Sequence, residues 1–288
     1  MIKKIILSLI ASILIFIIWG WFSIWRSPAQ FTDYESCGFD SLILSMDEYW
    51  KIIDQHPRPY IISIDNENAG SLFFFGSTHT TDPKHPEIKM IRDTWDNFQP
   101  TLALVEGRLG FLMPGFMHPI KTYGEMGAVN KLAKRSGVKT LSWEMPIENE
   151  ITQVLDKFSA EQVSLFYILR PYFSNFRHGK PEDPDQFIQQ FLSRGSVTGL
   201  DGIIGSVEDI DKVWQRDFAS LPDWRDTSDE YGLPGYLQEV SYESNMVRNK
   251  HLACLITHFV NLGERVFAIG GSSHPVCIDR AVTSAIEK

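Results

Sequence analysis

In RVFAIGGSSHP, residues 265–275, an apolar run stops abruptly in a turn of small residues that contains a histidine. Almost the same phrase occurs earlier, as SLFFFGSTHTT at residues 71–81. Each phrase reads as a buried strand that runs into Gly-x-x-His, which places His79 and His274 just past the strand ends. A glycine lets the backbone turn sharply there, since it has no Cβ. The repetition indicates two strands that present imidazoles at equivalent places.

Around these two phrases, short apolar runs alternate with stretches of helical spacing. The expected elements are strands at 71–76, 101–107, 138–144 and 265–271 and helices at 85–98, 123–137, 242–264 and 274–288. Gly137 is a plausible C-cap for the second helix. Strands separated by helices of about 10–15 residues form right-handed βαβ units and a parallel sheet. The predicted fold class is α/β, with a mostly parallel central sheet and flanking helices.

Residues 147–242 differ in character, because amphipathic helical patterns follow one another with no clear strand between them. One of these helices opens with a capping-box pattern formed by Ser159 and Gln162. We expect a helical insertion or lid over about 147–242, within a domain that spans 31–288.

Composition limits the class of protein. The chain has 288 residues, of which 43% are hydrophobic and 22% charged, and this suits a globular domain with a sizeable core. The net charge of −9 argues against a nucleic-acid partner, which normally requires a basic face. The three cysteines show no metal-binding spacing and allow one disulfide outside the cytoplasm. We interpret Cys254 and Cys277, which lie in apolar helical patterns, as buried thiols.

The N-terminus carries a long apolar stretch, with no charge from Ile5 to Trp25. At roughly 1.5 Å per helical residue it spans about 30 Å, the thickness of a bilayer core. A cleaved signal peptide has an apolar region of only about 7–15 residues. Here the stretch is longer, lacks a convincing cleavage site and ends in tryptophans, as an aromatic belt does. Residues 1–30 are therefore expected to form an uncleaved transmembrane signal anchor and linker.

Lysines precede this stretch and a single arginine follows it, so the positive-inside rule leaves the short N-terminus in the cytoplasm. The expected protein is single-pass, with the membrane as a partner and its folded domain extracytoplasmic, either periplasmic or extracellular. Residues 27–36 read as a linker between the anchor and the domain.

Four polar residues follow the ends of the predicted strands, namely His79, Glu106, Glu144 and His274. Ligands bind at the carboxyl ends of the strands in an open parallel sheet, so we expect these side chains at one edge. A lone histidine after a strand is usually a turn residue, but the same pattern at two equivalent places favours function. His79, Glu106 and His274 suit a divalent metal (Mn, Zn or Co) or a base and acid pair for hydrolysis. The sequence leaves that choice open.

Small hydroxyl residues lie between each glycine and its histidine. Ser77 and Ser273 are candidates for substrate binding, since their hydroxyls can donate hydrogen bonds, and Glu144 is a third candidate. The chain has no G-x-S-x-G elbow, and helix capping accounts equally well for hydroxyls at these places. A serine nucleophile is therefore not indicated.

The motifs GSTH and GSSH, with LALVEGR between them and NMVRNKHLACLI ahead of the second, resemble the TraB/TIKI/GumN group, which is related to the erythromycin esterases. The resemblance covers roughly residues 68–145 and 240–288. It implies that His79 and His274 are the two GxxH histidines, with Glu106 as the acidic residue after the second strand. It also implies that Arg248 is the helix arginine.

Members of the TIKI type look like metal-dependent proteases anchored at a membrane, the esterases open a macrolide lactone, and TraB members are linked to shutting down peptide pheromone signals. The resemblance implies a hydrolase acting on a peptide or small ester substrate. His79, Glu106, Arg248 and His274 would be catalytic, with Arg248 stabilising the oxyanion. The chain departs from the group in two ways: TIKI proteins are usually tethered from their other end, and the first motif has Ser where members often carry Thr or Glu.

A second class of function is a non-catalytic protein that uses the same cleft to sequester a peptide. The two classes differ in whether His79 and His274 must keep their chemistry. A purely structural membrane protein would leave the doubled motif unexplained.

Overall fold

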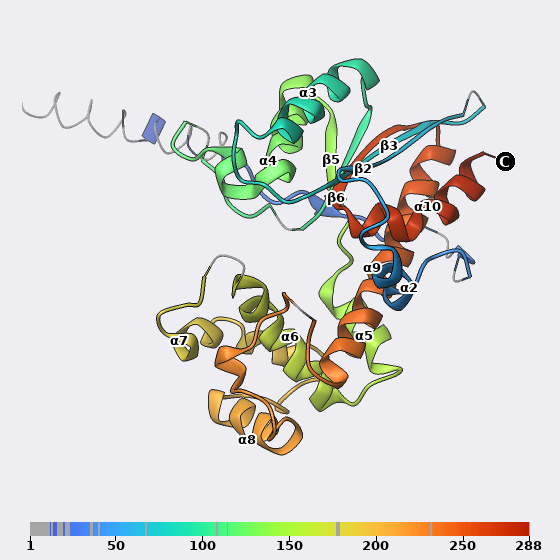
Figure 1. Ribbon diagram of the computed structural model, residues 1–288. Helices are drawn as coiled ribbons and strands as arrows, with labels where there is room; N and C mark the ends of the chain where they lie inside the picture. The colour runs from blue at the N-terminus through green and yellow to red at the C-terminus, as the bar shows by residue number, and fades with distance from the viewer. Residues whose placement is uncertain are drawn as a thin grey trace, which may run out of the picture. The chain divides into compact units, whose positions relative to one another are not determined.

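The protein is described by a computed structural model that covers residues 12, 14, 15, 20, 24–34, 37–39, 41–66, 68–107, 109–113, 115–176, 179–230 and 232–287 (Figure 1). The expected anchor falls mostly outside these residues. No helix within them has the length and apolarity needed to cross a membrane. The chain divides into two compact units. The first comprises 1–44, 48–144 and 249–288, and the second 45–47 and 145–248.

The first unit is built on a six-stranded sheet with the order β1-β5-β4-β6-β3-β2. Its strands are β1 (Ala29–Gln30), β2 (Tyr60–Asp65), β3 (Ser71–Ser77), β4 (Leu102–Val105), β5 (Lys139–Ser142) and β6 (Arg265–Gly271). Every neighbouring pair is parallel except β2 with β3. This confirms the predicted α/β fold with a mostly parallel central sheet.

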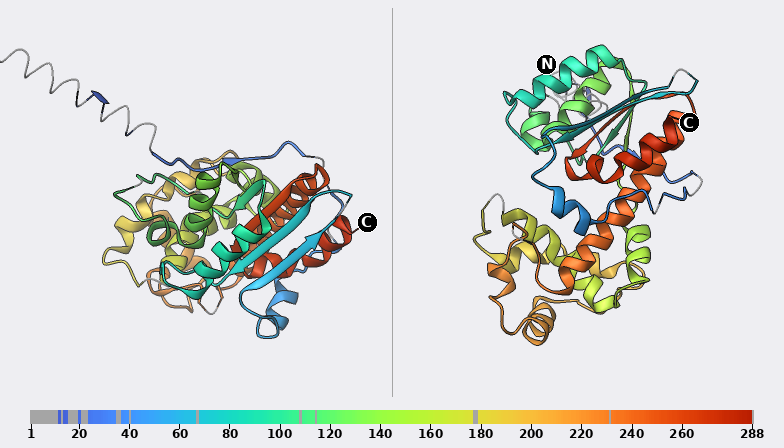
Figure 2. Two further views of the ribbon diagram at one scale, coloured as in Figure 1. Left: turned by 90° about the horizontal axis from the view of Figure 1, so that it is seen from above. Right: turned by 45° about the vertical axis from the view of Figure 1, so that its right-hand side comes forward.

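Helices flank the sheet on both faces (Figures 1 and 2). The helices of this unit are α2 (Met46–Ile52), α3 (Pro86–Phe98), α4 (Pro119–Ser136), α10 (Ser273–Ile286) and the second half of α9 (Tyr236–Asn261). One face of the sheet presents Phe75, Val105 and Ile269, which lie opposite one another in register and pack in one buried cluster with α3 and α4. The views place α9 and α10 on the other face. The central strands are therefore buried on both sides, as parallel strands require.

Local sequence accounts for the ends of the helices that flank the site. Helix α3 begins at Pro86, one residue after the expected start at 85, and the fixed φ of proline suits a first turn. Helix α4 ends at Gly137, which adopts the expected left-handed conformation with φ 70°. However, α4 begins at Pro119 rather than at 123, and non-helical angles at Tyr123 and Gly124 kink it near its start.

Two strands depart from the expectations. The predicted linker at 27–36 contains β1, a strand of two residues whose Ala29 pairs with Leu141 of β5. So short a strand has no periodicity to detect, and it forms because the edge of β5 offers free backbone partners. Strand β2 was not predicted either; it runs antiparallel to β3.

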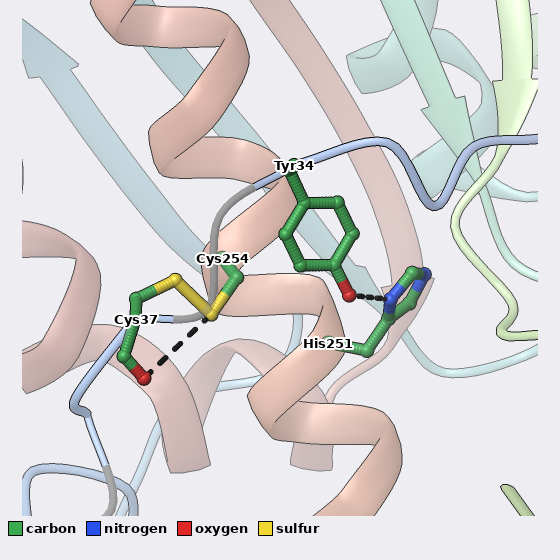
Figure 3. Close-up of a disulfide and its surroundings, with 4 residues drawn as sticks. All are labelled: Tyr34, Cys37, His251 and Cys254. Atoms are coloured by element: carbon green, nitrogen blue, oxygen red, sulfur yellow. Dashed lines mark hydrogen bonds between the residues drawn. A yellow bond between two sulfur atoms is a disulfide. The ribbon is translucent and has the colours of Figure 1, made fainter. Parts of the chain in front are cut away.

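A disulfide joins Cys37 to Cys254 of α9, with 5.7 Å between the two Cα atoms (Figure 3). Close by, the Tyr34 hydroxyl is hydrogen-bonded to Nδ1 of His251, and burial raises the pKa of Tyr34 to about 12. The disulfide and this hydrogen bond attach Cys37 and Tyr34, which follow β1, to α9.

The interpretation of Cys254 as a buried thiol is therefore wrong, although Cys277 is a buried, unpaired thiol as expected. An apolar helical pattern indicates burial, but it cannot reveal a partner 217 positions away. Burial raises the pKa of the Cys277 thiol to about 12, so the thiol stays protonated near neutral pH.

Replacing Cys37 and Cys254 together by serine is expected to lower the free energy of unfolding by about 3–5 kcal/mol, because the unfolded chain regains the freedom of a very long loop. Urea unfolding of the full chain with and without reductant measures the loss. The Cys277→Ala variant is the matched control and should keep its sensitivity to reductant. Three alkylatable thiols in unreduced, unfolded protein would contradict the pairing.

The second unit contains helices and no strand among its described residues. Its elements are α5 (Ile147–Leu155), α6 (Ala160–Asn175), α7 (Pro184–Gln189), the 3₁₀ helix η2 (Leu192–Ser196), α8 (Val207–Asp217), the 3₁₀ helix η3 (Trp224–Asp226) and the first half of α9. Ser159 and Gln162 form the predicted capping box at the start of α6.

A buried carboxylate ties three helices of this unit together. Glu150 of α5 accepts hydrogen bonds from the Tyr167 hydroxyl of α6, at 2.6 Å, and from the Ser244 hydroxyl of α9, at 2.5 Å. The Arg170 guanidinium lies 3.8 Å from the same carboxylate. Burial raises the pKa of Tyr167, with the Glu150 charge adding to the rise, so the phenol remains a donor. The surrounding core is apolar and largely aromatic.

Candidate active site

The two GxxH motifs lie side by side in the sheet. Strands β3 and β6 are parallel neighbours, with Gly76 opposite Gly270 and Ser77 opposite Gly271. The Ser272 amide donates to the Ser77 carbonyl at 3.0 Å, so the pairing continues past the end of β6. The expectation that both motifs reach one edge of one sheet is confirmed.

The glycine of each motif makes room for a residue of the other motif. A Cβ on Gly76 would lie 2.5 Å from Cγ of Pro275, which follows the second histidine. A Cβ on Gly271 would lie 2.7 Å from Nε2 of His79, the first histidine. Neither glycine has a positive φ, so close approach, rather than backbone conformation, explains both.

The two histidines nevertheless differ in backbone and in exposure. His79 lies in a loop, is exposed, and adopts a left-handed conformation with φ 63°. His274 lies in the first turn of α10 and is only 5% exposed. The difference arises because α10 begins within two residues of β6, whereas α3 begins only at Pro86.

Glu106 places its carboxylate between the ends of β4 and β6. The residue follows β4, and its amide donates to the Ile269 carbonyl at 3.1 Å. Its Oε2 accepts a hydrogen bond from the Gly271 amide at 2.7 Å, and its Oε1 lies 3.5 Å from Nε2 of His274. The side chain is 16% exposed. Since Nε2 of His79 also lies against Gly271, the three side chains share one small region.

Two further residues fix the orientation of His274. Its Nδ1 lies 2.6 Å from Oδ1 of Asn249 on α9, and a carbonyl oxygen can only accept there, so Nδ1 carries the proton. The Trp143 ring packs edge-on against the imidazole at 4.9 Å, and its Nε1 donates to the Ile269 carbonyl at 2.9 Å. In the neutral tautomer this leaves the Nε2 lone pair directed at Glu106.

The predicted substrate-binding residues fall in different places. Ser77 is 1% exposed, and its hydroxyl donates to the Gly270 carbonyl at 3.3 Å. Such burial contradicts direct contact with a substrate; the hydroxyl bridges two strands instead. Ser273 is partly exposed at the start of α10. Glu144 is partly exposed beyond β5, which is separated from β6 by β4.

Arg248 is the last residue of the second unit. It is 5% exposed, and its guanidinium donates to Oδ1 of Asn245, one turn earlier on α9, at 3.2 Å. Arg248 is therefore a buried residue of α9, not an exposed one. Its role in stabilising an oxyanion stays a prediction.

The donor types at this edge fit a divalent metal ion, since imidazole nitrogens and a carboxylate are common ligands. A metal-ligating histidine commonly donates its other ring N–H to an oxygen acceptor, which fixes the ring's orientation. The hydrogen bond from Nδ1 of His274 to Asn249 has this form. Within the described part of the chain, however, no three His, Cys, Asp or Glu side chains are grouped closely enough to hold an ion. Nε2 of His274 and Oε1 of Glu106 lie 3.5 Å apart, and two acceptors that face each other at this distance favour a proton or a cation between them.

Sequence reasoning missed four residues around this site: Trp143, Asn249, Glu87 and Glu125. Glu87 and Glu125 bind the loop that carries His79. Burial raises the pKa of Glu125, while its hydrogen bonds with backbone amides and the nearby His79 lower it. One signal was present in the sequence, because Glu125 is a charged residue between two closely spaced glycines, Gly124 and Gly127, within YGEMGA.

Comparisons of the chain with family models, with characterised proteins and with solved structures return no match. The resemblance to the TraB/TIKI/GumN group therefore rests on the short motifs and on their order along the chain.

Proposed function

We propose that this protein is a membrane-anchored, extracytoplasmic hydrolase of the TraB/TIKI type that cleaves a peptide or ester bond. One observation carries the proposal: the Glu106 carboxylate, bonded to the Gly271 amide, lies 3.5 Å from Nε2 of His274. Nε2 of His79 reaches the same glycine from the other GxxH motif. A purely structural role does not require two imidazoles and a carboxylate at one strand edge.

The arrangement supports general acid–base chemistry. Nε2 of His274 takes a proton from a water molecule whose oxygen forms a bond to the carbonyl carbon of the substrate, and Glu106 stabilises the resulting imidazolium. The exposed His79 donates a hydrogen bond to the oxyanion that develops on the carbonyl oxygen. His274 then returns the proton to the leaving amine or alkoxide as the bond to the carbonyl carbon breaks. Asn249 keeps the reactive nitrogen of His274 aimed at the site throughout.

A divalent metal held by Glu106, His274 and His79 would require these side chains to come closer together than they lie in the described structure. When bound, such an ion lowers the pKa of its water toward neutrality and polarises the scissile carbonyl. Asn249 and the Gly271 amide would then orient the histidine and the carboxylate, respectively.

The disulfide supports the proposed location. Disulfides persist in the periplasm and outside the cell but are rare in the cytosol. The pairing of Cys37 with Cys254 therefore agrees with an extracytoplasmic domain, as does the charge pattern that flanks the apolar N-terminal stretch.

The test is a cleavage screen of the full chain, purified in detergent without a chelator, against a peptide library and a panel of esters. The metal content is measured by elemental analysis, and activity is followed through EDTA treatment and metal readdition. We expect cleavage above the level of a variant that carries both His79→Ala and His274→Ala. Equal rates for the two proteins would reject the hydrolase, and peptide binding without cleavage would identify a sequestering protein instead.

A further inference from the structure

Two buried carboxylates lie beneath the loop that carries His79. Glu87 in the first turn of α3 is 4% exposed, and Glu125 in α4 is 1% exposed. Burying a carboxylate costs free energy unless hydrogen bonds compensate for the lost hydration. Neither residue has a part in the chemistry proposed above, so their burial requires another explanation.

Their carboxylates accept hydrogen bonds from the residues on both sides of His79. Oε2 of Glu87 accepts from the Thr78 amide at 3.1 Å, and its Oε1 accepts from the Thr78 hydroxyl at 2.8 Å. Oε1 of Glu125 accepts from the Thr80 amide. Hydrogen bonds to an ionised carboxylate are roughly twice as strong as neutral ones. The residues before and after His79 are thus anchored to two different helices.

These hydrogen bonds hold His79 in an unfavourable backbone conformation. The left-handed φ of 63° at His79 is unfavourable for a residue with a Cβ, by roughly 1–2 kcal/mol. The same conformation places Nε2 of His79 against Gly271, beside the Glu106 carboxylate. Relaxation of the loop to a negative φ would redirect the side chain away from that place.

A kink near the start of α4 brings Glu125 close to the loop that carries His79. Gly124 has φ 56° and ψ −141°, so the helix is interrupted immediately before Glu125. A Cβ on Gly124 would lie 2.8 Å from the Thr80 carbonyl oxygen. The loop and the kink therefore fit together only because position 124 lacks a side chain, and this close approach brings the Thr80 amide to Glu125.

We infer that Glu125, supported by Glu87, is a positioning residue that holds the His79 imidazole at the Glu106 edge of the site. The inference rests on the proposed hydrolase function for its catalytic consequence, but the hydrogen bond itself can be measured separately.

In the hydrolysis assay, Glu125→Ala is expected to lower kcat by about 10²-fold with little change in KM, because a displaced catalytic group costs rate rather than binding. Glu125→Gln should stay within about threefold of the parent, since its amide oxygen still accepts the Thr80 hydrogen bond. Lys131→Ala, an exposed change on the same helix, is the control. If Glu125 had only a structural role, the loss of kcat in each variant would instead match the loss of folded protein measured in a thermal melt.

Hydrogen exchange of the Thr80 amide provides the second measurement. Loss of one hydrogen bond in Glu125→Ala should speed this exchange by about tenfold or more, and Glu125→Gln should largely restore protection. If Glu125→Ala does not fold, hydrogen exchange in the parent protein still tests the inference. Rapid exchange of the Thr80 amide in the parent would overturn it.

The outcomes separate the two proposals. Turnover in the parent that Glu125→Ala leaves intact overturns the positioning role. Absence of turnover in the parent and in the histidine variants alike rejects the hydrolase, whatever the exchange of Thr80 shows.

Discussion

Alanine in place of His274 is expected to lower kcat by about 10³-fold while the chain stays folded, because a positioned general base supplies about 10²–10⁴ in rate. The imidazole is held by Asn249, is packed by Trp143 and faces Glu106, so its Nε2 is the nitrogen positioned for proton transfer. Removing a buried, hydrogen-bonded side chain should also cost about 1–3 kcal/mol, which is less than the usual stability of a domain. Initial rates and a thermal melt of the same preparation measure both effects.

The matched control is His258→Gln. His258 is near the C-terminal end of α9, and the chain runs from there into the start of β6, so it lies at the opposite end of the strand from His274. This variant should retain the parent rate. Full activity in folded His274→Ala would contradict the assignment of His274 as the base.

Replacing Glu106 by glutamine is expected to lower kcat by about 10²-fold or more, with little loss of stability. The amide oxygen of glutamine can still accept the Gly271 hydrogen bond, so the backbone at the end of β6 keeps its partner. What disappears is the negative charge beside Nε2 of His274, at 3.5 Å, which stabilises the imidazolium or holds a cation. Steady-state rates and metal content, measured on the same sample, give the two readouts.

Glu264→Gln provides the corresponding control at the other end of the same strand. Glu264 directly precedes β6, and its carboxylate accepts a hydrogen bond from the Thr101 hydroxyl, which a glutamine can also do. Its kcat should equal that of the parent. Equal losses in the two glutamine variants would mean that the effect is general to the charge of the domain and does not belong to the site.

The strands that carry the site could be predicted because their apolar runs are strong and end in glycine or a charged residue, as at Val105–Glu106. The placement of β6 between β4 and β3 could not, since strand order depends on tertiary packing between distant segments. The pairing of Cys37 with Cys254 escaped for the same reason. The edge strand β1 has too few residues to carry a pattern at all.

The two GxxH motifs show where local sequence stops being informative. Their sequences are nearly identical, yet His274 lies inside a helix and His79 in a left-handed loop. The reason lies outside each motif: α10 starts immediately after β6, and two buried carboxylates from α3 and α4 hold the first motif's loop. Asn249 was likewise hidden, because nothing in its own helix pattern indicates that it orients a histidine 25 positions away.

A double-mutant cycle tests most directly whether the two imidazoles form one centre. It compares kcat/KM for the parent, His79→Ala, His274→Ala and the variant with both changes, all shown to be folded. Residues that act as a unit are strongly non-additive, so the double variant should be hardly slower than the slower single variant. A double variant whose loss equals the product of the two single losses would show that the histidines act independently, and would contradict the shared site.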